Sequence, residues 1–300
     1  MDNYRRSVSS DVITRAYLDS LLVEMRHLDA VKPSTELKLY GKTFATPVMT
    51  GALSHLNNTY PDGMAQMAKG ASAAGAVVWS GMGPQEELEA MVATGASVIK
   101  IIKTYADRDS IRRKIAHAEE CGALAVGLDI DHAFERKNGY DRIDGMDMYP
   151  LSSAELSQLV KSTSLPFVIK GVLSRQDARK CLDAGVQGMV VSHHNGRLDC
   201  AVPPLMILPE ILEETEGKVP LFVDCSLQSG LDVFKALALG ATACSVGRPL
   251  MNRLRTDGAA GVQAGVEEIT RDLAYTLAMT CSKDITSIDR TVVRESRFSW

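Results

Sequence analysis

A chain of 300 residues, 45% of them hydrophobic, is long enough to bury a large core, either in one barrel of about 250 residues or in two ordinary domains. The formal net charge is −4, and acidic and basic residues are interspersed rather than gathered in blocks. This distribution argues against a basic nucleic-acid-binding surface and against an acidic disordered arm. We therefore expect no nucleic acid among the partners.

The cysteines indicate a reducing compartment. Six are present, with neither a CxxC pair nor a Cys/His spacing suited to zinc, and most stand among small or apolar residues. Residues 1–6 are polar and lead into no apolar signal core, and no run reaches the roughly 18 apolar residues of a membrane span. These features predict a cytoplasmic protein with no membrane segment and no metal site.

A short phrase recurs along the chain, in which a helix-like segment ends in a glycine and a short apolar run follows. A glycine at a helix C-terminus allows a positive φ, and an uninterrupted apolar run is typical of a parallel strand covered on both faces. Alternating helices and buried parallel strands make an α/β fold. The phrase occurs at Gly75, Gly95, Gly122, Gly185 and Gly240.

The predicted elements favour a single (β/α)8 TIM barrel over residues 46–280. An N-terminal extension, residues 1–45, precedes it with a helix over 12–27, and a polar tail, 281–300, follows it. Between strands, Ser174 and Asp177 resemble a capping box, and the last helix is expected over 261–280. A doubly wound sheet would show a glycine fingerprint after the first strand, which this chain lacks. The eight expected strands cover residues 47–50, 76–80, 98–102, 125–130, 166–170, 188–192, 221–224 and 243–247.

Polar residues stand where the predicted strands end, which is the catalytic face of such barrels. One polar residue at a strand end is often only a solvated loop position. Eight at the mouth of one barrel indicate a functional site. These strand ends carry Thr50, Ser80, Lys103, Asp129, Lys170, Ser192 with His193 and His194, Asp224, and Gly247 with Arg248.

Three groups of residues at these ends suggest chemistry. Gly247 and Arg248 follow the eighth strand, where barrels often bind phosphate; the alternative is a turn with a surface arginine. His193 and His194 cannot both face one ligand from an extended backbone, so one histidine as general base beside Arg197 is the coherent interpretation, with a structural pair as the alternative. Lys103 and Asp129 should be neighbours and form an ion pair.

A lysine at a barrel mouth either stabilises charge on a cofactor or forms a Schiff base after burial lowers its pKa. Both uses are open for Lys103 and Lys170.

Several stretches together resemble the FMN-dependent 2-hydroxy-acid oxidase family, to which glycolate oxidase, lactate oxidase and flavocytochrome b2 belong. The resemblance covers about residues 45–290 and is dense from 165 to 250. It is carried by LPFVIKGVL at 165–173, VVSHHNGR at 190–197, DVFKALALGA at 232–241 and GRP at 247–249.

The resemblance implies FMN across the barrel mouth and a small carboxylate as substrate. His194 matches the base that takes a proton as the substrate α-carbon is oxidised, and Arg197 matches an arginine that grips the carboxylate. Tyr105 matches a tyrosine that hydrogen-bonds the substrate. Lys170 matches the lysine beside flavin N1 and O2. The family commonly forms tetramers or octamers, so a homo-oligomer is expected.

The resemblance also implies the cofactor-binding residues. Gly247 and Arg248 match the phosphate loop, Asp224 matches a carboxylate near the ribityl chain, and Ser80 is expected to face the flavin. The remaining residues expected around FMN are Ala52, Lys103, Asp129, Ser192, Ser226 and Gln228.

Departures from the family pattern bear on cofactor and reaction. Gln228 stands where the family has an arginine on the FMN phosphate, a loss of about 1–3 kcal/mol that Ser226 and Ser229 would partly recover. Lys103 replaces a glutamine and Asp129 a threonine. In the active-site loop, His193 replaces an asparagine and Asn195 a glycine. Arg136 stands near the family's second carboxylate-binding arginine without matching it.

These departures leave two alternatives to a flavin oxidoreductase. One is a flavin-independent lyase or isomerase that uses Lys103, Asp129 and Lys170 for Schiff-base or proton-transfer chemistry. The other is a non-catalytic ligand-binding barrel. The colour of the purified protein separates a flavoprotein from both.

Overall fold

Eight parallel strands form one sheet in the computed structural model, which describes residues 8–136 and 139–296. The spatial order is β4-β15-β14-β13-β12-β7-β6-β5, which follows the chain once around the sheet. Each strand coincides with one of the eight predicted runs, so the predicted barrel is confirmed. The strands are β4 Val48–Thr50, β5 Val78–Ser80, β6 Val98–Lys103, β7 Ala125–Asp129, β12 Phe167–Val172, β13 Gly188–Val191, β14 Leu221–Val223 and β15 Ala243–Val246.

The two ends of this sheet, β4 and β5, meet through a side chain as well as the backbone. Thr50 Oγ1 accepts a hydrogen bond from Trp79 N at 2.9 Å, and Thr50 N donates to Val77 O at 3.3 Å. One further parallel bridge joins Leu53 to Ser80. These contacts close the sheet into a barrel.

Large apolar side chains fill the barrel interior. The Trp79 and Phe222 rings pack edge to face with centroids 5.3 Å apart, although β5 and β14 are not adjacent strands. Trp79 Nε1 lies 3.1 Å from Met49 Sδ. The barrel is therefore a packed core, and chemistry is confined to its mouth.

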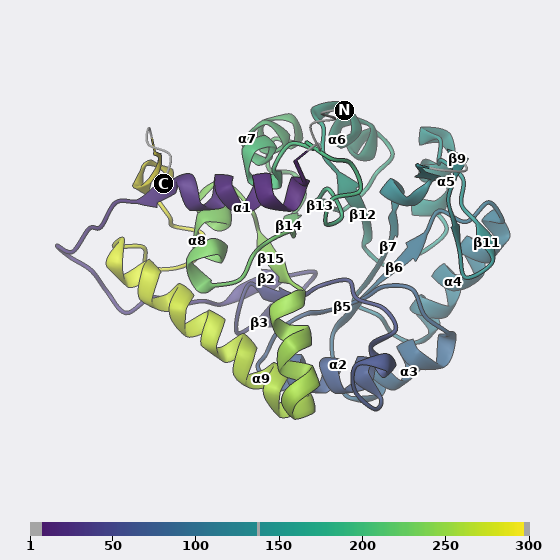
Figure 1. Cartoon of the computed structure of the whole chain (residues 1–300), viewed down its shortest axis with the longest axis horizontal. Coiled ribbons are helices and arrows are strands. Elements are labelled where there is room, and N and C mark those ends of the chain that lie inside the picture. The colour runs from purple at the N-terminus through teal and green to yellow at the C-terminus, as the bar shows by residue number, and fades with distance from the viewer. Residues whose placement is uncertain (1–7, 137–138, 297–300) are drawn as a thin grey trace, which may run out of the picture.

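A helix follows each strand and covers the outside of the barrel, as Figure 1 shows. The five glycines of the recurring phrase all have positive φ, between 71° and 110°, as predicted. Ser174 caps its helix by accepting from Asp177 N at 3.1 Å, but the Asp177 carboxylate bonds the serine hydroxyl rather than closing a full capping box. These helices are α2 Gly63–Ala73, α3 Gln85–Ala93, α4 Arg108–Glu120, α5 Ser153–Val160, α6 Arg175–Asp183, α7 Pro204–Thr215, α8 Gly230–Ala238 and α9 Arg248–Met279.

The predicted last helix, residues 261–280, corresponds to the second of two helical arms in α9, and the first arm was not predicted. The helix α9 begins at Arg248, directly after β15, and is bent at Asp257 and Gly258, which leave helical geometry. Gly258 has φ +58°, and an added Cβ would lie 2.8 Å from the Tyr60 ring. The first arm of α9 begins at the barrel mouth, and the bend lets the second arm pack along α2. Both arms are visible in Figure 1.

The predicted N-terminal helix over 12–27 is too long. The helix α1 spans Ser10–Ser20, and the chain then becomes extended in β1, Leu21–Val23, which pairs antiparallel with β16, Val293–Glu295. The C-terminal tail thus holds the N-terminal extension by a pairing that a local pattern does not reveal. The helix α1 lies beside α8 (Figure 1), where Lys235 Nζ donates to Leu18 O at 2.7 Å.

Short hairpins complete the fold. β2 Leu37–Leu39 pairs with β3 Lys42–Phe44 before the barrel begins. After β7 and the 3-10 turn η2, Ile130–His132, two hairpins form a flap at the mouth: β8 Phe134–Glu135 with β9 Gly139–Tyr140, and β10 Arg142–Ile143 with β11 Met146–Asp147. Two further 3-10 turns are η1 Leu56–Asn58 and η3 Arg290–Val292. Among the described residues, none of the helices is long and apolar enough to span a membrane. The predicted absence of a signal core concerns residues 1–6, which lie outside the described residues.

Candidate active site

The loop after β13 presents His194 by an unusual backbone. His194, Asn195 and Gly196 are three consecutive residues with positive φ, of 49°, 56° and 91°. The His194 amide donates to Ser192 Oγ at 3.0 Å, and the Gly196 amide donates to His193 Nδ1 at 3.0 Å. Left-handed non-glycine residues cost free energy and persist where their surroundings fix them, often at functional sites.

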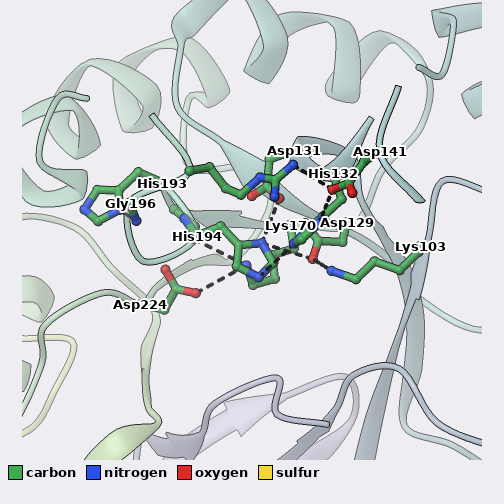
Figure 2. Close-up of polar contacts among 12 residues, drawn as sticks. Lys103, Asp129, Asp131, His132, Asp141, Lys170, His193, His194, Gly196 and Asp224 are labelled. Carbon is green, nitrogen blue, oxygen red and sulfur yellow. Dashed lines mark hydrogen bonds and ion pairs between the residues drawn. The ribbon is translucent and has the colours of Figure 1, made fainter. Parts of the chain in front are cut away.

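Two aspartates orient the His194 imidazole. His194 Nδ1 lies 2.7 Å from Asp131 Oδ1 and 3.3 Å from Asp129 Oδ2. Burial lowers the pKa of His194, but the hydrogen bonds to Asp129 and Asp131 outweigh it and raise the pKa above its ordinary value. Figure 2 shows the imidazole at the centre of the cluster, with its Nδ1 directed at the carboxylates.

A second histidine touches His194 from the flap side. His132 Nε2 lies 3.3 Å from His194 Nε2, and His132 Nδ1 lies 3.1 Å from Asp141 Oδ2. The same Asp141 oxygen accepts from Arg197 Nη2 at 2.8 Å, and Arg197 Nη2 also donates to the Phe134 carbonyl. Arg197 therefore belongs to the same network as His194.

The predicted pair of Lys103 and Asp129 is confirmed, with Lys103 Nζ 2.7 Å from Asp129 Oδ2 and both side chains largely buried. Burial raises the pKa of Asp129, but Lys170, His194 and Lys103 together hold it well below its ordinary value. Asp129 is thus an anion shared by two lysines and a histidine.

Lys170 lies at the floor of the mouth. Its Nζ is 3.4 Å from Ser192 Oγ and 3.6 Å from Asp224 Oδ2. Burial lowers its pKa, but the carboxylates of Asp129 and Asp224 outweigh that effect and raise it. Lys170 is a fixed cation whose nearest partners are at long distances, which leaves donors for a ligand.

Gly171 makes room for this arrangement. It interrupts the β12–β13 register with φ +96°, and an added Cβ would lie 2.7 Å from Asp131 Oδ2. A side chain here would displace the aspartate that orients His194.

A cavity of about 630 Å³ opens at the barrel mouth beside this cluster. Its volume lies in the range of small-molecule and cofactor sites. Eight of the predicted site residues line it: Ala52, Lys170, His194, Asp224, Ser226, Gln228, Gly247 and Arg248.

The far end of the cavity is the predicted phosphate site. Arg248 bonds Asn195 Oδ1, and its Nη2 is 3.3 Å from Asp11 Oδ2 on α1. Asp11 Oδ1 is buried, with no hydrogen-bond partner among the described residues. The cation at this end is therefore partly neutralised by a carboxylate that no sequence pattern predicted.

The turn between β14 and Gln228 has a left-handed backbone at two residues that are not glycine. Cys225 and Ser226 have φ of +72° and +60°. The turn therefore contains two consecutive left-handed non-glycine residues, each at a cost in free energy.

Other predicted residues do not line the cavity. Ser80 accepts a hydrogen bond from buried Lys100 at 3.2 Å, because its neighbour Trp79 points into the barrel and alternate residues of a strand face opposite sides. Tyr105 is buried against α4, with Lys114 Nζ 5.7 Å from its ring centroid. The predicted contacts of Ser80 with the flavin and of Tyr105 with the substrate do not arise in this arrangement.

The remaining predicted residues support the cluster or stand apart from it. Ser192 contacts Lys170, as described. His193 turns away from the cavity, and its Nε2 lies 2.7 Å from Thr14 Oγ1, so the two adjacent histidines face different groups as expected. Arg136 pairs with Asp199 at 2.8 Å.

Sequence reasoning missed Asp131, His132 and Asp141. Asp131 and His132 directly follow the end of β7, where two titratable residues in succession were an available signal. Asp141 enters through the β9–β10 connection, and nothing in the sequence places it near Arg197.

Comparison with known proteins identifies the family of this chain. The family model described as FMN-dependent dehydrogenase matches residues 8–153 and 144–295. Glycolate oxidase 3 of Arabidopsis thaliana is 28% identical over 303 residues, covering 89% of this chain and 82% of the relative. Glycolate oxidase of Spinacia oleracea is 26% identical over 306 residues, covering 90% of this chain and 82% of its own length.

Solved structures give the same result. A crystal structure of mandelate oxidase superposes with a TM-score of 0.87 at 28% identity, covering 96% of this chain and 91% of that chain. A mandelate oxidase variant solved with a monooxide FMN adduct superposes with a TM-score of 0.84 at 28% identity, covering 95% and 91%. The fold, the cavity and the match along both halves agree: the chain belongs to the FMN-dependent dehydrogenase family.

Proposed function

We propose that this flavoenzyme oxidises a small 2-hydroxy acid to the 2-oxo acid, with His194 as base and Arg197 holding the substrate carboxylate. One observation carries the proposal: an imidazole oriented by Asp131 lies on the wall of the same cavity as the buried cation Lys170. A base and a buried positive charge facing one space suit the removal of a proton while negative charge moves to an acceptor.

The residues of the cavity fit FMN. Gly51 and Gly247 both line the cavity, and neither has a side chain that would occupy it at the strand ends. In this proposal Lys170 would hold the ring, Asp224 would bond the ribityl hydroxyls, and Gly247 with Arg248 would bind the phosphate at the start of α9; all four residues line the cavity.

Oxidation of a 2-hydroxy acid removes two electrons and two protons. FMN, when bound, would supply the acceptor for the electron pair that leaves the α-carbon and for the second proton. His194 accepts one of the two protons at Nε2, and its Nδ1–H stays bonded to Asp131, which stabilises the imidazolium that forms. The buried charge of Lys170 favours negative charge on the neighbouring ring.

Arg197 fixes the substrate relative to the base. Two of its five N–H donors, both on Nη2, bond Asp141 and the Phe134 carbonyl, and these bonds hold the guanidinium on the flap side of His194. The other donors can hold a carboxylate, which would bring the α-carbon near the imidazole.

The lyase or isomerase alternative gains no support from the lysines. A Schiff base needs a neutral amine, whereas the carboxylates of Asp129 and Asp224 overcome burial and raise the pKa of Lys170. Burial lowers the pKa of Lys103, but Asp129 holds its ammonium at 2.7 Å.

A cytoplasmic location and a homo-oligomer, tetramer or octamer, stay predictions. All six cysteines are free, which agrees with a reducing compartment. One relative is a peroxisomal (S)-2-hydroxyacid oxidase of Arabidopsis thaliana, 27% identical over 301 residues, so fractionation of the source cell is the deciding measurement. Light scattering gives the oligomeric state.

A substrate panel tests the proposed function. The FMN-loaded enzyme is incubated with short 2-hydroxy acids, both enantiomers of each, and the 2-oxo acid is measured as its hydrazone. We expect turnover of at least one acid and none of the matching 2-hydroxy amide, which lacks the carboxylate for Arg197. Equal turnover of acid and amide would contradict the role of Arg197, and the absence of any 2-oxo acid would contradict the activity.

A further inference from the structure

His132 and His194 contact each other at the barrel mouth, and the nature of this contact depends on which ring nitrogens carry hydrogen. His132 Nε2 and His194 Nε2 are 3.3 Å apart, with ring centroids 4.4 Å apart and the planes at 76°. A hydrogen bond at this contact needs a proton on one nitrogen and a lone pair on the other.

The partners of the two Nδ1 atoms determine whether each Nε2 atom carries a hydrogen or a lone pair. His194 Nδ1 faces oxygens of Asp131 and Asp129, and His132 Nδ1 faces Asp141, whose same oxygen also accepts from Arg197. Ionised carboxylates only accept, so both Nδ1 atoms carry hydrogen. With both rings neutral, two lone pairs would then face each other at Nε2. One additional proton turns that repulsion into an N–H···N bond.

The surroundings place this proton on His194. Burial, Lys103 and His194 lower the pKa of His132 to about 4, so His132 is neutral at ordinary pH. The aspartates raise the pKa of His194 despite its burial. The charged groups that face the pair are Lys103, Asp129, Asp131, Asp141, Lys170 and Arg197.

We propose that His132 is a positioning residue that accepts a hydrogen bond from His194 Nε2–H once His194 has taken a proton from the substrate. The inference rests on the proposed function of His194. Hydrogen bonds then run in one direction from His194 through His132 to Asp141 (Figure 2). The same Asp141 oxygen also accepts from Arg197. The base and the carboxylate-binding arginine are thereby joined in one chain of contacts.

The arrangement acts as a two-state contact. When His194 is neutral, its Nε2 lone pair finds no hydrogen on His132 and remains available to accept a proton from the substrate. When His194 is protonated, His132 Nε2 accepts a hydrogen bond from its Nε2–H, which stabilises the imidazolium. His132 needs no proton of its own for this role.

Two substitutions separate this role from simple packing. His132→Leu fills the space without an acceptor, whereas His132→Asn supplies an amide oxygen that can accept from His194 Nε2. In FMN-loaded protein labelled with 15N-histidine, which holds only six histidines, we expect His132→Leu to lower the pKa of His194 by about one unit or more. His132→Asn should restore at least half of that shift, and the acid limb of kcat/KM against pH should move in step.

Equal His194 titration in both variants and the wild type would overturn the inference, and so would equal shifts in Leu and Asn, since desolvation alone then explains them. His194→Asn keeps the two claims apart. If it leaves turnover unchanged, the proposed base is wrong; if it abolishes turnover while His132→Leu leaves the His194 pKa unchanged, only the role of His132 fails.

A metal ion is the competing occupant of this contact. Ligand atoms of Asp129, Asp131, His132 and His194 lie within 4.8 Å of one another, and the two Nε2 atoms are spaced for one divalent ion. We expect chelator-treated enzyme to keep its activity and to bind no stoichiometric Zn²⁺ at the mouth, because Lys103, Lys170 and Arg197 lie close by. Zn²⁺ bound by the wild type, required for turnover and lost in His132→Leu, would overturn the proton-sharing assignment.

Discussion

Asp131→Asn is the substitution that most directly perturbs the proposed base. Asparagine keeps the shape of the side chain, and its amide oxygen can still accept from His194 Nδ1, so the change removes charge rather than the contact at 2.7 Å. A charge-assisted hydrogen bond is worth about 1.5–3 kcal/mol and a neutral one about 0.5–1.5 kcal/mol. The loss of roughly 1–1.5 kcal/mol corresponds to about one pKa unit. Asp129, 3.3 Å from the same nitrogen, keeps the loss from being larger.

The sign of the pH effect follows from the role of the base. His194 acts when neutral, and the aspartates raise its pKa above the ordinary histidine value, so activity falls as pH falls through that raised pKa. In Asp131→Asn the acid limb of kcat/KM should move to lower pH by about one unit. The rate at high pH should fall about tenfold, because the imidazolium formed in the reaction loses the same stabilisation.

Steady-state kinetics from pH 5 to 9, with flavin content measured for each preparation, are the assay. Asp147→Asn is the control, because that carboxylate is exposed and pairs with Arg142 on the flap rather than with His194. An acid limb that stays in place, or that moves to higher pH, would refute the assignment of Asp131 as the partner of the base.

Three further predictions concern the cofactor, the ion pair and the second histidine of the loop. Arg248→Ala should weaken FMN binding about tenfold or more and leave riboflavin binding unchanged, whereas Asp11→Asn should strengthen FMN binding by releasing Arg248. Fluorescence titration with both ligands checks this, and equal effects on FMN and riboflavin would show that Arg248 does not bind the phosphate. The destabilisations caused by Lys103→Met and by Asp129→Asn should add up to more than the destabilisation of the double variant, with a coupling of about 1–3 kcal/mol in urea unfolding. A double-mutant cycle without coupling would reject the buried pair. His193→Asn should change turnover little but destabilise the docking of α1 by about 1–2 kcal/mol, since the bond to Thr14 is lost; a large fall in kcat without a change in stability would contradict this.

The barrel could be predicted because its signals are local and repeated. Each glycine that ends a helix, such as Gly95 or Gly240, marks a positive φ that other residues rarely adopt, and each apolar run after it is a strand covered on both faces. The end of α1 at Ser20 could not be predicted in this way. It depends on pairing between Leu21–Val23 and a strand more than 250 residues away.

Site residues could be predicted where sheet register alone places them. Lys103 and Asp129 are partners in adjacent parallel strands, so their contact follows from the strand ends. The direction of the Ser80 side chain could not be predicted in this way, because the inward direction of Trp79 is set by packing across the barrel. Asp141 and Asp11 reach the site from the flap and from α1, and their approach depends on tertiary structure that no spacing in the sequence records.

The central claim is that His194 is the base of an FMN-dependent 2-hydroxy-acid oxidation, and anaerobic single-turnover reduction tests it most directly. FMN-loaded wild type and His194→Asn are mixed with an active 2-hydroxy acid, and bleaching of the flavin absorbance is followed in a stopped-flow instrument. We predict that the wild type bleaches fully, and that His194→Asn binds FMN as well but bleaches at least about 100-fold more slowly. Bleaching of His194→Asn at the wild-type rate, with equal flavin content, would contradict the account.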